Sequence, residues 1–150
     1  MQELTVMVRF SASVSIDRPT DEVFAFLLDP ANETRWQKDV VEARTDSGDP
    51  VNVGSTGYDI RRSMGRNMKA TWQCTALEPG KMFGFKVLKP VPFSATYEFE
   101  SGPAGVTVTM NAEPTGFTRL LWPLIARSGK SQYARDFAAL KRVLESNGTA

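Results

Sequence analysis

The sequence predicts an α+β fold in which a curved antiparallel β-sheet wraps around a long C-terminal α-helix, with two short helices after the first strand. Three observations predict this fold. A strand-like alternation opens the chain, alternating segments separated by turn residues fill its middle, and apolar residues at helical spacing close it. The long helix has an apolar face to cover, and the apolar face of the sheet is the surface that can cover it.

The first predicted strand spans residues 6–16. Its even positions are all apolar: Val6, Val8, Phe10, Ala12, Val14 and Ile16. Its odd positions are mostly polar: Met7, Arg9, Ser11, Ser13 and Ser15. This alternation is typical of a half-buried strand.

Two short helices are predicted next. Thr20 is a suitable N-cap and is followed by two acidic residues, which favour a helix over residues 20–28. Pro30 ends that helix because a proline disfavours the helical conformation of the residue before it. A second short helix is expected over residues 31–36.

The middle of the chain reads as a meander of antiparallel strands. The turns between these strands are predicted at residues 47–50, 65–67, 78–80, 89–92 and 101–105. One parity of each strand is apolar: Tyr58, Ile60 and Met64; Met68, Ala70, Trp72, Cys74 and Ala76; Phe83, Phe85 and Val87; Phe93, Ala95, Tyr97 and Phe99; Val106, Val108, Met110 and Ala112. The opposite parity is mostly polar, so we expect one face of the sheet to be buried against other elements and the opposite face to be exposed to solvent.

The turn at residues 65–67 tests the consistency of that assignment. A two-residue loop at Gly65 and Arg66 would set the apolar parity of one strand beside the polar parity of the next. A three-residue loop pairs Met64 with Met68 and keeps both apolar parities on one face. We therefore predict the three-residue loop, with Asn67 in the left-handed conformation.

The last predicted element is a long helix over residues 118–146. Thr118 is a plausible N-cap, and apolar residues recur at helical spacing to Leu144. Pro123 and Gly129 interrupt this pattern. Either residues 118–122 form a lead-in turn with Pro123 near the true start, or the helix is kinked.

Composition excludes several classes of function. The 150 residues carry 18 Lys and Arg, 17 Asp and Glu and no His, for a net charge of +1, so no strongly basic surface for nucleic acid is expected. Without His, the Ser-His and Cys-His catalytic pairs and the His-bearing zinc sites are excluded. The lone Cys74 cannot form an internal disulfide and fits a reducing compartment. The length predicts a single domain over residues 1–150.

Targeting signals are not visible in the sequence. Glu3 and Arg9 lie inside the first alternating segment, a pattern unlike that of a signal peptide. No run approaches the roughly 18 consecutive apolar residues of a membrane span. We therefore expect a cytoplasmic protein without stable membrane insertion.

Four segments resemble the helix-grip superfamily, which includes START-type lipid-transfer domains, birch-pollen-allergen-like proteins and the polyketide cyclase/dehydrase branch. They are VSIDRPTDEVFAFL at 14–27, DP at 29–30 leading to Trp36, GSTG at 54–57, and LKRVLE at 140–145. The resemblance covers nearly the whole chain and implies a cavity between the concave sheet and the long helix. These segments are fold signals without a catalytic signature, and no motif implies a cofactor or a metal.

The candidate ligand-binding residues are those of the apolar parity and the long helix. The strands contribute Tyr58, Ile60, Arg62, Met64, Met68, Trp72, Phe83, Phe85, Phe93, Tyr97, Phe99 and Met110, and the helix contributes Leu121, Leu124 and Phe137. An apolar wall with a few polar tips suits a lipid, an isoprenoid or a polycyclic aromatic molecule. The same residues would equally form an ordinary packed core.

Polar candidates within this set are few. Arg62 is the one charged residue on the apolar parity and would anchor a ligand oxygen, unless it reaches water near the strand end. The carboxylates of the strands, such as Asp59, fall on the polar parity, so no inward carboxylate pair is expected. Cys74 falls on the inner parity, where a buried thiol is usually inert.

Three functions fit these observations. The leading hypothesis is the binding or transport of a hydrophobic small molecule. The alternative is a cofactor-free polyketide cyclase or dehydratase that uses Arg62, Tyr58 and Tyr97. The third is a protein-interaction module on the same fold. A monomer is expected, or a homodimer formed through the region of Trp36 or Trp122.

Overall fold

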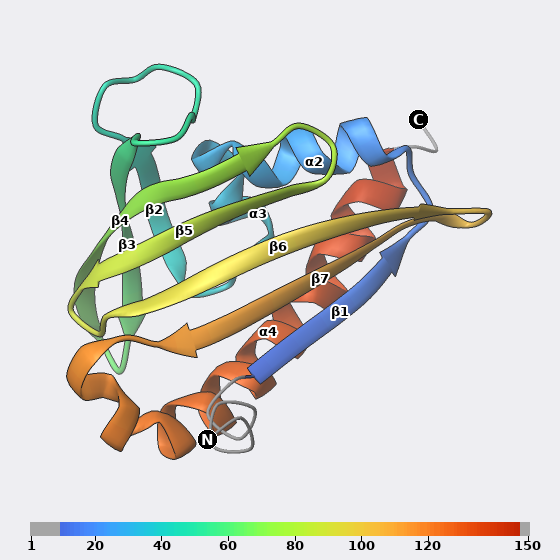
Figure 1. Ribbon diagram of the computed structural model, residues 1–150. Helices are drawn as coiled ribbons and strands as arrows, with labels where there is room; N and C mark the ends of the chain where they lie inside the picture. Colours follow the sequence, from blue (N-terminus) through green and yellow to red (C-terminus); the bar gives the residue numbers. More distant parts are fainter. Residues whose placement is uncertain (1–9, 148–150) are drawn as a thin grey trace.

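Seven antiparallel strands form one strongly curved sheet in the computed structural model, which describes residues 10–147 (Figure 1). The strands are β1 (Phe10–Ile16), β2 (Val40–Thr45), β3 (Thr56–Ser63), β4 (Arg66–Glu78), β5 (Met82–Lys89), β6 (Phe93–Gly102) and β7 (Gly105–Pro114). Their order across the sheet is β1-β7-β6-β5-β4-β3-β2. The predicted α+β class and helix-grip layout are confirmed.

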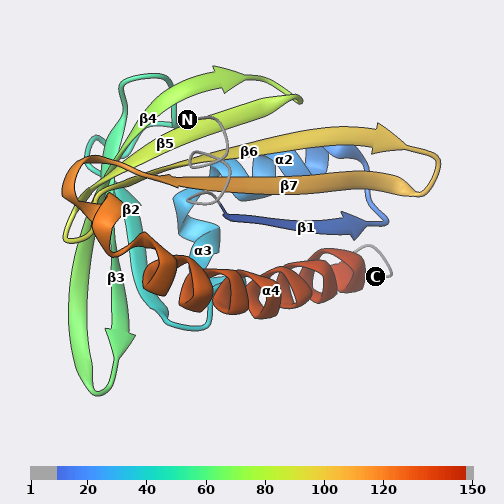
Figure 2. The ribbon, with the colours of Figure 1, turned by 60° about the horizontal axis from the view of Figure 1, so that its bottom comes forward.

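The long helix α4 (Trp122–Asn147) lies along the concave side of the sheet (Figure 2). It packs against β1, and a Cβ at Gly129 would lie 2.9 Å from the Phe10 ring. Gly129 therefore marks a close approach of helix and strand, and any larger residue there would displace Phe10.

The two alternatives for the start of this helix are resolved in favour of a lead-in turn. The 3₁₀ helix η2 (Gly116–Leu120) precedes α4, and Pro123 is the second residue of α4. The predicted N-cap at Thr118 is wrong, because Thr115 caps η2. The Thr118 hydroxyl instead joins η2 to the connection between β5 and β6, where it donates a hydrogen bond of 2.8 Å to the carbonyl oxygen of Pro92.

The first strand confirms the predicted alternation over residues 10–16, and residues 6–9 lie outside the described part of the chain. Ser11, Ser13 and Ser15 are on the outer face, opposite Asn111, Thr109 and Thr107 of β7. The alternate residues of both strands enter the core, which contains Ile16 and Val108 with no exposed surface.

The segment after β1 forms α2 (Thr20–Leu28), the 3₁₀ helix η1 (Pro30–Asn32) and α3 (Glu33–Trp36). The N-cap of α2 is Pro19 rather than Thr20, and no side chain caps that end. The expected second helix over residues 31–36 is divided, because Asp29 caps η1 by accepting a hydrogen bond of 3.0 Å from the Ala31 backbone N–H. Glu33 consequently becomes the first residue of α3.

The β3–β4 hairpin contradicts the predicted three-residue turn. Ser63 pairs with Arg66, so the loop contains only Met64 and Gly65, whose φ angles are 53° and 78°. Two successive left-handed residues are typical of a type I′ turn, which matches the twist of the flanking strands. The resulting register turns Asp59 and Arg61 toward the inside of the sheet.

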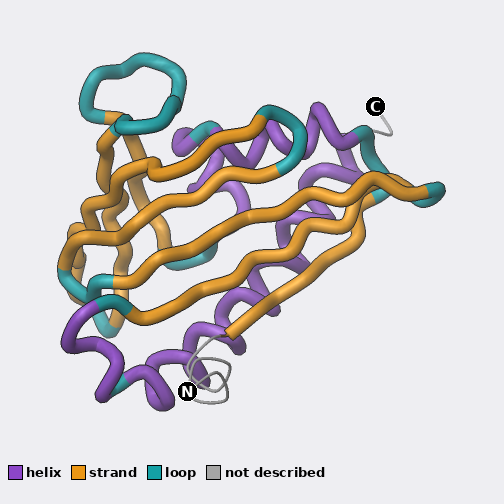
Figure 3. The backbone as a smooth tube through the Cα atoms, in the orientation of Figure 1, coloured by secondary structure: helices purple, strands orange, loops and turns teal. Residues whose placement is uncertain are grey.

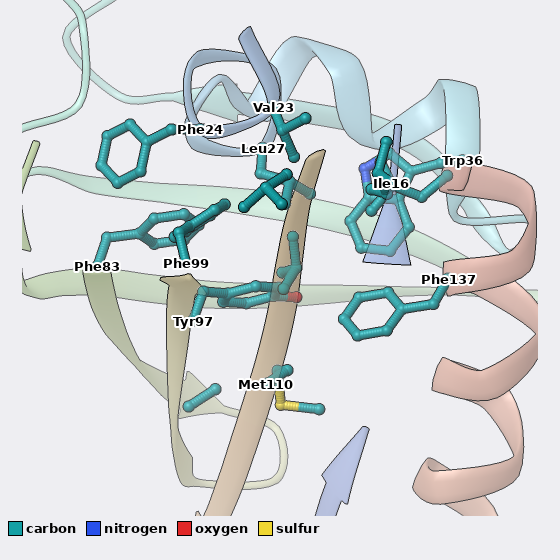
Figure 4. Close-up of a cluster of buried hydrophobic side chains, with 14 of the residues drawn as sticks. Ile16, Val23, Phe24, Leu27, Trp36, Phe83, Tyr97, Phe99, Met110 and Phe137 are labelled. Atoms are coloured by element: carbon teal, nitrogen blue, oxygen red, sulfur yellow. The ribbon is translucent and has the colours of Figure 1, made fainter. Parts of the chain in front are cut away.

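Aromatic rings form a large part of the core between α2, α4 and the sheet. Figure 4 shows side chains of α2 pointing toward Phe83, Phe99 and Tyr97 of the sheet. Phe24 meets Phe99 edge-on, with ring centroids 5.0 Å apart, and Phe83 stacks on Tyr97 at 4.9 Å. Such contacts add to the burial of apolar area and fix the positions of the rings.

The two tryptophans expected at a dimer surface are buried. Trp36 is 4% exposed and packs against Phe137, whereas Trp122 is 1% exposed and stacks near Phe10. The expectation that these two side chains are exposed is therefore wrong, and both belong to the core.

Candidate functional site

A cavity of about 250 Å³ lies between the concave side of the sheet and helices α3 and α4. Strands β3 to β6 form most of its wall. Leu27, Leu28 and Pro30 close one side, and Val51 reaches it from the β2–β3 loop, the large teal loop of Figure 3. The strong curvature of the sheet leaves this space, since a flat sheet would pack directly on the helix.

Aromatic side chains form a large part of the wall. Phe83 and Phe85 of β5, Phe93 and Tyr97 of β6, and Trp72 of β4 line it from the sheet. Trp36 and Tyr133 line it from the helices. The Trp72 indole Nε1 is buried and has no hydrogen-bond acceptor among the described residues.

A charged cluster occupies the end of the cavity next to α3. Asp59, 6% exposed, and Arg61 extend inward from β3. The Arg61 Nη2 lies 3.2 Å from Asp59 Oδ2 and donates a hydrogen bond of 2.8 Å to Gln37 Oε1. Burial opposes the guanidinium charge, but attraction by Asp59 and neighbouring groups outweighs it, so the pKa of Arg61 is raised.

Glu33 approaches the same cluster from α3. Its carboxyl group hydrogen-bonds that of Asp59, and its Oε2 atom is buried. Burial, followed by repulsion from Asp59, raises the pKa of Glu33 to about 8. At neutral pH Glu33 therefore holds a proton, which serves as the donor between two carboxyl groups that otherwise only accept.

Two tyrosines and a further carboxyl group border the cluster. The side chains of Tyr97 and Tyr133 hydrogen-bond each other, and burial raises the pKa of both phenols. Asp136 of α4 is 5% exposed, and its pKa is raised by burial. The inner end of the cavity thus combines neutral hydroxyl groups, one guanidinium and the carboxyl groups of Glu33 and Asp59, while Asp136 lies near Arg61 outside the cavity wall.

Comparison with known proteins identifies the family. A family model described as polyketide cyclase/dehydrase and lipid transport matches residues 7–145. The chain belongs to this family. A search of the curated proteins finds no match.

Solved structures with a similar fold match nearly the whole chain. A protein from Nitrosomonas europaea shares 13% identity and a TM-score of 0.79, over 95% of this chain and 97% of that one. A polyketide-cyclase-like protein from Corynebacterium glutamicum shares 18% identity and a TM-score of 0.66, over 93% of both chains. At these identities the similarity shows the fold alone.

A third structure is the di-domain aromatase/cyclase from the steffimycin biosynthetic pathway. It shares 13% identity with this polyketide cyclase/dehydrase family member, at a TM-score of 0.75. The match covers 99% of this chain and 55% of the other, so the chain spans about half of that two-domain protein.

The residues expected from the sequence divide into three groups in this family member. Five line the cavity: Trp72, Phe83, Phe85, Phe93 and Tyr97. Three are buried in the core outside the cavity wall: Phe99, Met110 and Phe137. The other seven are exposed or face outward: Tyr58, Ile60, Arg62, Met64, Met68, Leu121 and Leu124.

The orientation expected for the third group is wrong for two reasons. In β3 the two-residue turn inverts the predicted parity, so Tyr58 faces outward, where its hydroxyl donates a hydrogen bond of 2.5 Å to Glu42 Oε2. Arg62 is exposed and donates to Asn67 Oδ1. Met64 is 99% exposed because it forms the turn, and Leu124 is 74% exposed on the solvent side of α4.

Several cavity residues were not among the candidates expected from the sequence, and those that form the polar end are Glu33, Gln37, Asp59, Arg61 and Tyr133. The hairpin between β3 and β4 could have indicated the orientation of Asp59. Once Met64 and Gly65 are taken as the turn, Asp59 falls on the same face as Trp72. Glu33 carried no comparable signal, because α3 has only four residues.

Residues 10–147 contain no group of three or more His, Cys, Asp or Glu side chains placed to hold a metal ion. Cys74 is buried in the wall of the cavity, and burial raises the pKa of its thiol. Among the helices of the described residues, none combines the length and hydrophobicity needed to cross a bilayer.

Proposed function

We propose that this protein is a cytoplasmic binding or transport protein for a hydrophobic small molecule, held in the cavity with its polar end toward Glu33, Asp59 and Arg61. The observation that carries the proposal is an aromatic-lined cavity of about 250 Å³ that ends in a buried charged cluster. Apolar walls with a few convergent polar groups are the usual form of a ligand site. The family description, which includes lipid transport, supports the same function.

The size of the cavity favours a compact ligand. Ligand pockets commonly have volumes of about 300–1,000 Å³, and this cavity, at about 250 Å³, is slightly smaller. Removing apolar ligand surface from water contributes about 25 cal/mol per Å². A fused-ring aromatic or a short isoprenoid suits such a wall better than a long acyl chain.

Native mass spectrometry of the freshly purified protein tests this proposal. We expect an adduct of a few hundred daltons that solvent extraction releases. Ala70→Phe should abolish the adduct, because Ala70 lines the cavity and a phenyl ring there fills it. Ala138→Phe places the same ring on the exposed side of α4 and should leave the adduct unchanged. An adduct retained in Ala70→Phe, or its loss in both variants, would contradict a cavity ligand.

A second function, a cofactor-free cyclase or dehydratase, is favoured by Glu33. A buried acid with a pKa of about 8 can both donate and accept a proton near neutral pH. The printed name of the steffimycin-pathway neighbour, an aromatase/cyclase, points to the same class of reaction. Turnover assays on aromatic polyketide-like substrates test this function. Activity that survives Glu33→Gln and Arg61→Gln would exclude these residues from it.

A further inference from the structure

We propose that the ligand of this cavity is a hydrophobic organic cation, an amine whose ammonium group contacts the Glu33 and Asp59 carboxyl groups while its apolar body packs on the aromatic wall. This inference rests on the proposed binding function and narrows it to one class of ligand.

The first support is a pair of carboxyl groups that have few donors in the protein. Arg61 occupies Asp59 Oδ2. Asp59 Oδ1 and Glu33 Oε2 are both buried, and apart from the proton that the two carboxyl groups share, no group of the described chain donates to either of them. Buried acceptors of this kind are costly unless a donor reaches them. A shared proton is one such donor, and a ligand N–H group is another.

The second support is an excess of acid at this end of the cavity. Three buried or partly buried carboxyl groups, those of Glu33, Asp59 and Asp136, surround the guanidinium of Arg61. Tyr97 and Tyr133 complete the cluster as neutral hydroxyl groups.

The cation near Asp136 is again Arg61, so one guanidinium serves all three carboxyl groups. Lys38 donates its backbone N–H to Asp136, but Lys38 itself is exposed, and Asp39 adds a further negative charge nearby. A ligand cation would therefore reduce the imbalance of charge, whereas a ligand carboxylate would increase it.

The third support is the aromatic wall itself. Trp72, Phe83 and Phe85 from the sheet face the same cavity as Tyr133 and Trp36 from the helices. The negative face of an aromatic ring attracts a cation within about 6 Å of its centroid, and this attraction strengthens where water is excluded. A wall of rings next to a carboxyl pair provides both kinds of cation recognition in one site.

Binding of an ammonium group should be coupled to loss of a proton. At pH 7 a Glu33 carboxyl group with a pKa of about 8 is mostly protonated. The arriving cation favours the carboxylate form, so the proton that joins Glu33 and Asp59 is released. A neutral ligand of the same shape leaves that proton in place.

Isothermal titration calorimetry with three naphthalene probes tests the proposal. Naphthylmethylamine, naphthylmethanol and naphthoate present the same ring with a cationic, a neutral or an anionic end. We expect the amine to bind about tenfold more tightly than the alcohol, because charge-assisted hydrogen bonds are the stronger ones, and naphthoate to bind most weakly. In two buffers of different ionisation enthalpy, the amine alone should release close to one proton at pH 7.

A pair of variants assigns the preference to the carboxyl pair. Glu33→Gln imitates the protonated side chain and should retain the fold, lower the affinity for the amine to that of the alcohol, and abolish proton release. Glu100→Gln removes an exposed carboxylate from β6 and should change none of the three affinities.

The outcomes separate this inference from the proposed function. If the alcohol binds and is lost in Ala70→Phe, but the amine has no advantage, the cavity is a ligand site and the cation preference is wrong. If naphthoate binds most tightly, the preference is reversed and the inference also falls. If none of the three probes binds, both the inference and the proposed function are contradicted.

Discussion

Strands β6 and β3 form parts of the same cavity wall, yet they use opposite chemistry on their inner faces. In β6 the inward residues include Tyr97 and Phe99, which pack in the aromatic core. In β3 the inward residues include Asp59 and Arg61, whereas Ile60 lies on the outer parity. The first strand follows the rule that apolar residues are buried, and the second departs from it where the cavity has its polar end. Such departures are costly to stability, so they are expected where function requires them.

The largest effect on stability is expected in β6, where the inward residues pack in the aromatic core. Phe99→Ala should lower the free energy of unfolding by about 3–5 kcal/mol, because it removes a buried ring and leaves a void between Phe24 and Phe83. Chemical denaturation measures the loss. Phe99→Leu should cost less, since it keeps most of the apolar volume. Equal losses in the two variants would contradict a packed aromatic core at this position.

The polar end of the cavity should make the stability of the protein depend on pH. The folded pKa of Glu33, about 8, is above its ordinary value of 4.5, so between these values the folded state binds more protons than the unfolded state. The contribution of Glu33 to the free energy of unfolding is fully present below about pH 4.5. It decreases as the pH rises toward 8, by up to about 1.4 kcal/mol per pH unit.

Glu33→Gln should remove that dependence. Denaturation curves of the wild type and the variant between pH 5 and pH 8 should therefore diverge, with the wild type losing stability relative to Glu33→Gln by about 3 kcal/mol in total. Glu100→Gln, at an exposed site, should follow the wild type at every pH. Parallel curves for the wild type and Glu33→Gln would show that Glu33 is ionised and solvated in the folded protein.

The contrast between the strands also shows how far the sequence predicts this molecule. Alternation and helical spacing predict the layout because each depends on many residues, and an error at one position does not change the pattern. The inner face of β3 depends on one turn. A loop of two residues instead of three moves Asp59 from outside to inside, and hydrophobicity alone favours the opposite choice.

The inward orientation of Glu33 could not be predicted for a different reason. Glu33 faces the cavity because Asp29 caps η1 and thereby fixes where α3 begins. A helix of four residues is too short to show periodicity, so nothing in its sequence distinguishes an inward carboxyl group from a solvated one. Buried charged groups are recognised only after the long-range packing is known.

A smaller loss of stability is expected from breaking the charge pair in β3. Asp59→Ala leaves Arg61 without its carboxylate and should lower the free energy of unfolding by about 2 kcal/mol. Removing one partner from a fully buried ion pair costs about 3–5 kcal/mol. The expected loss is smaller here because the Arg61 side chain is 31% exposed. Asp59→Ala combined with Arg61→Met should recover most of the loss, since the uncompensated charge is then gone. A double variant as unstable as the two single losses added together would show that the pair is not coupled.

The smallest effect on stability and ligand binding is expected from Arg62, the charged residue that the sequence placed on the apolar parity of β3. Arg62 is adjacent to Arg61, but it is exposed and donates to Asn67 near the hairpin end. Arg62→Ala should change the free energy of unfolding by less than about 0.5 kcal/mol, and the affinity for naphthylmethanol should stay the same. Arg61→Ala, one residue earlier, should alter both measurements because its side chain holds Gln37 and Asp59 in the cavity wall. Two neighbouring arginines with the same charge then differ only in the face of β3 that they occupy. If Arg62→Ala weakened binding as much as Arg61→Ala, the register set by the turn at Met64 and Gly65 would be wrong, and with it the assignment of the polar end of the cavity.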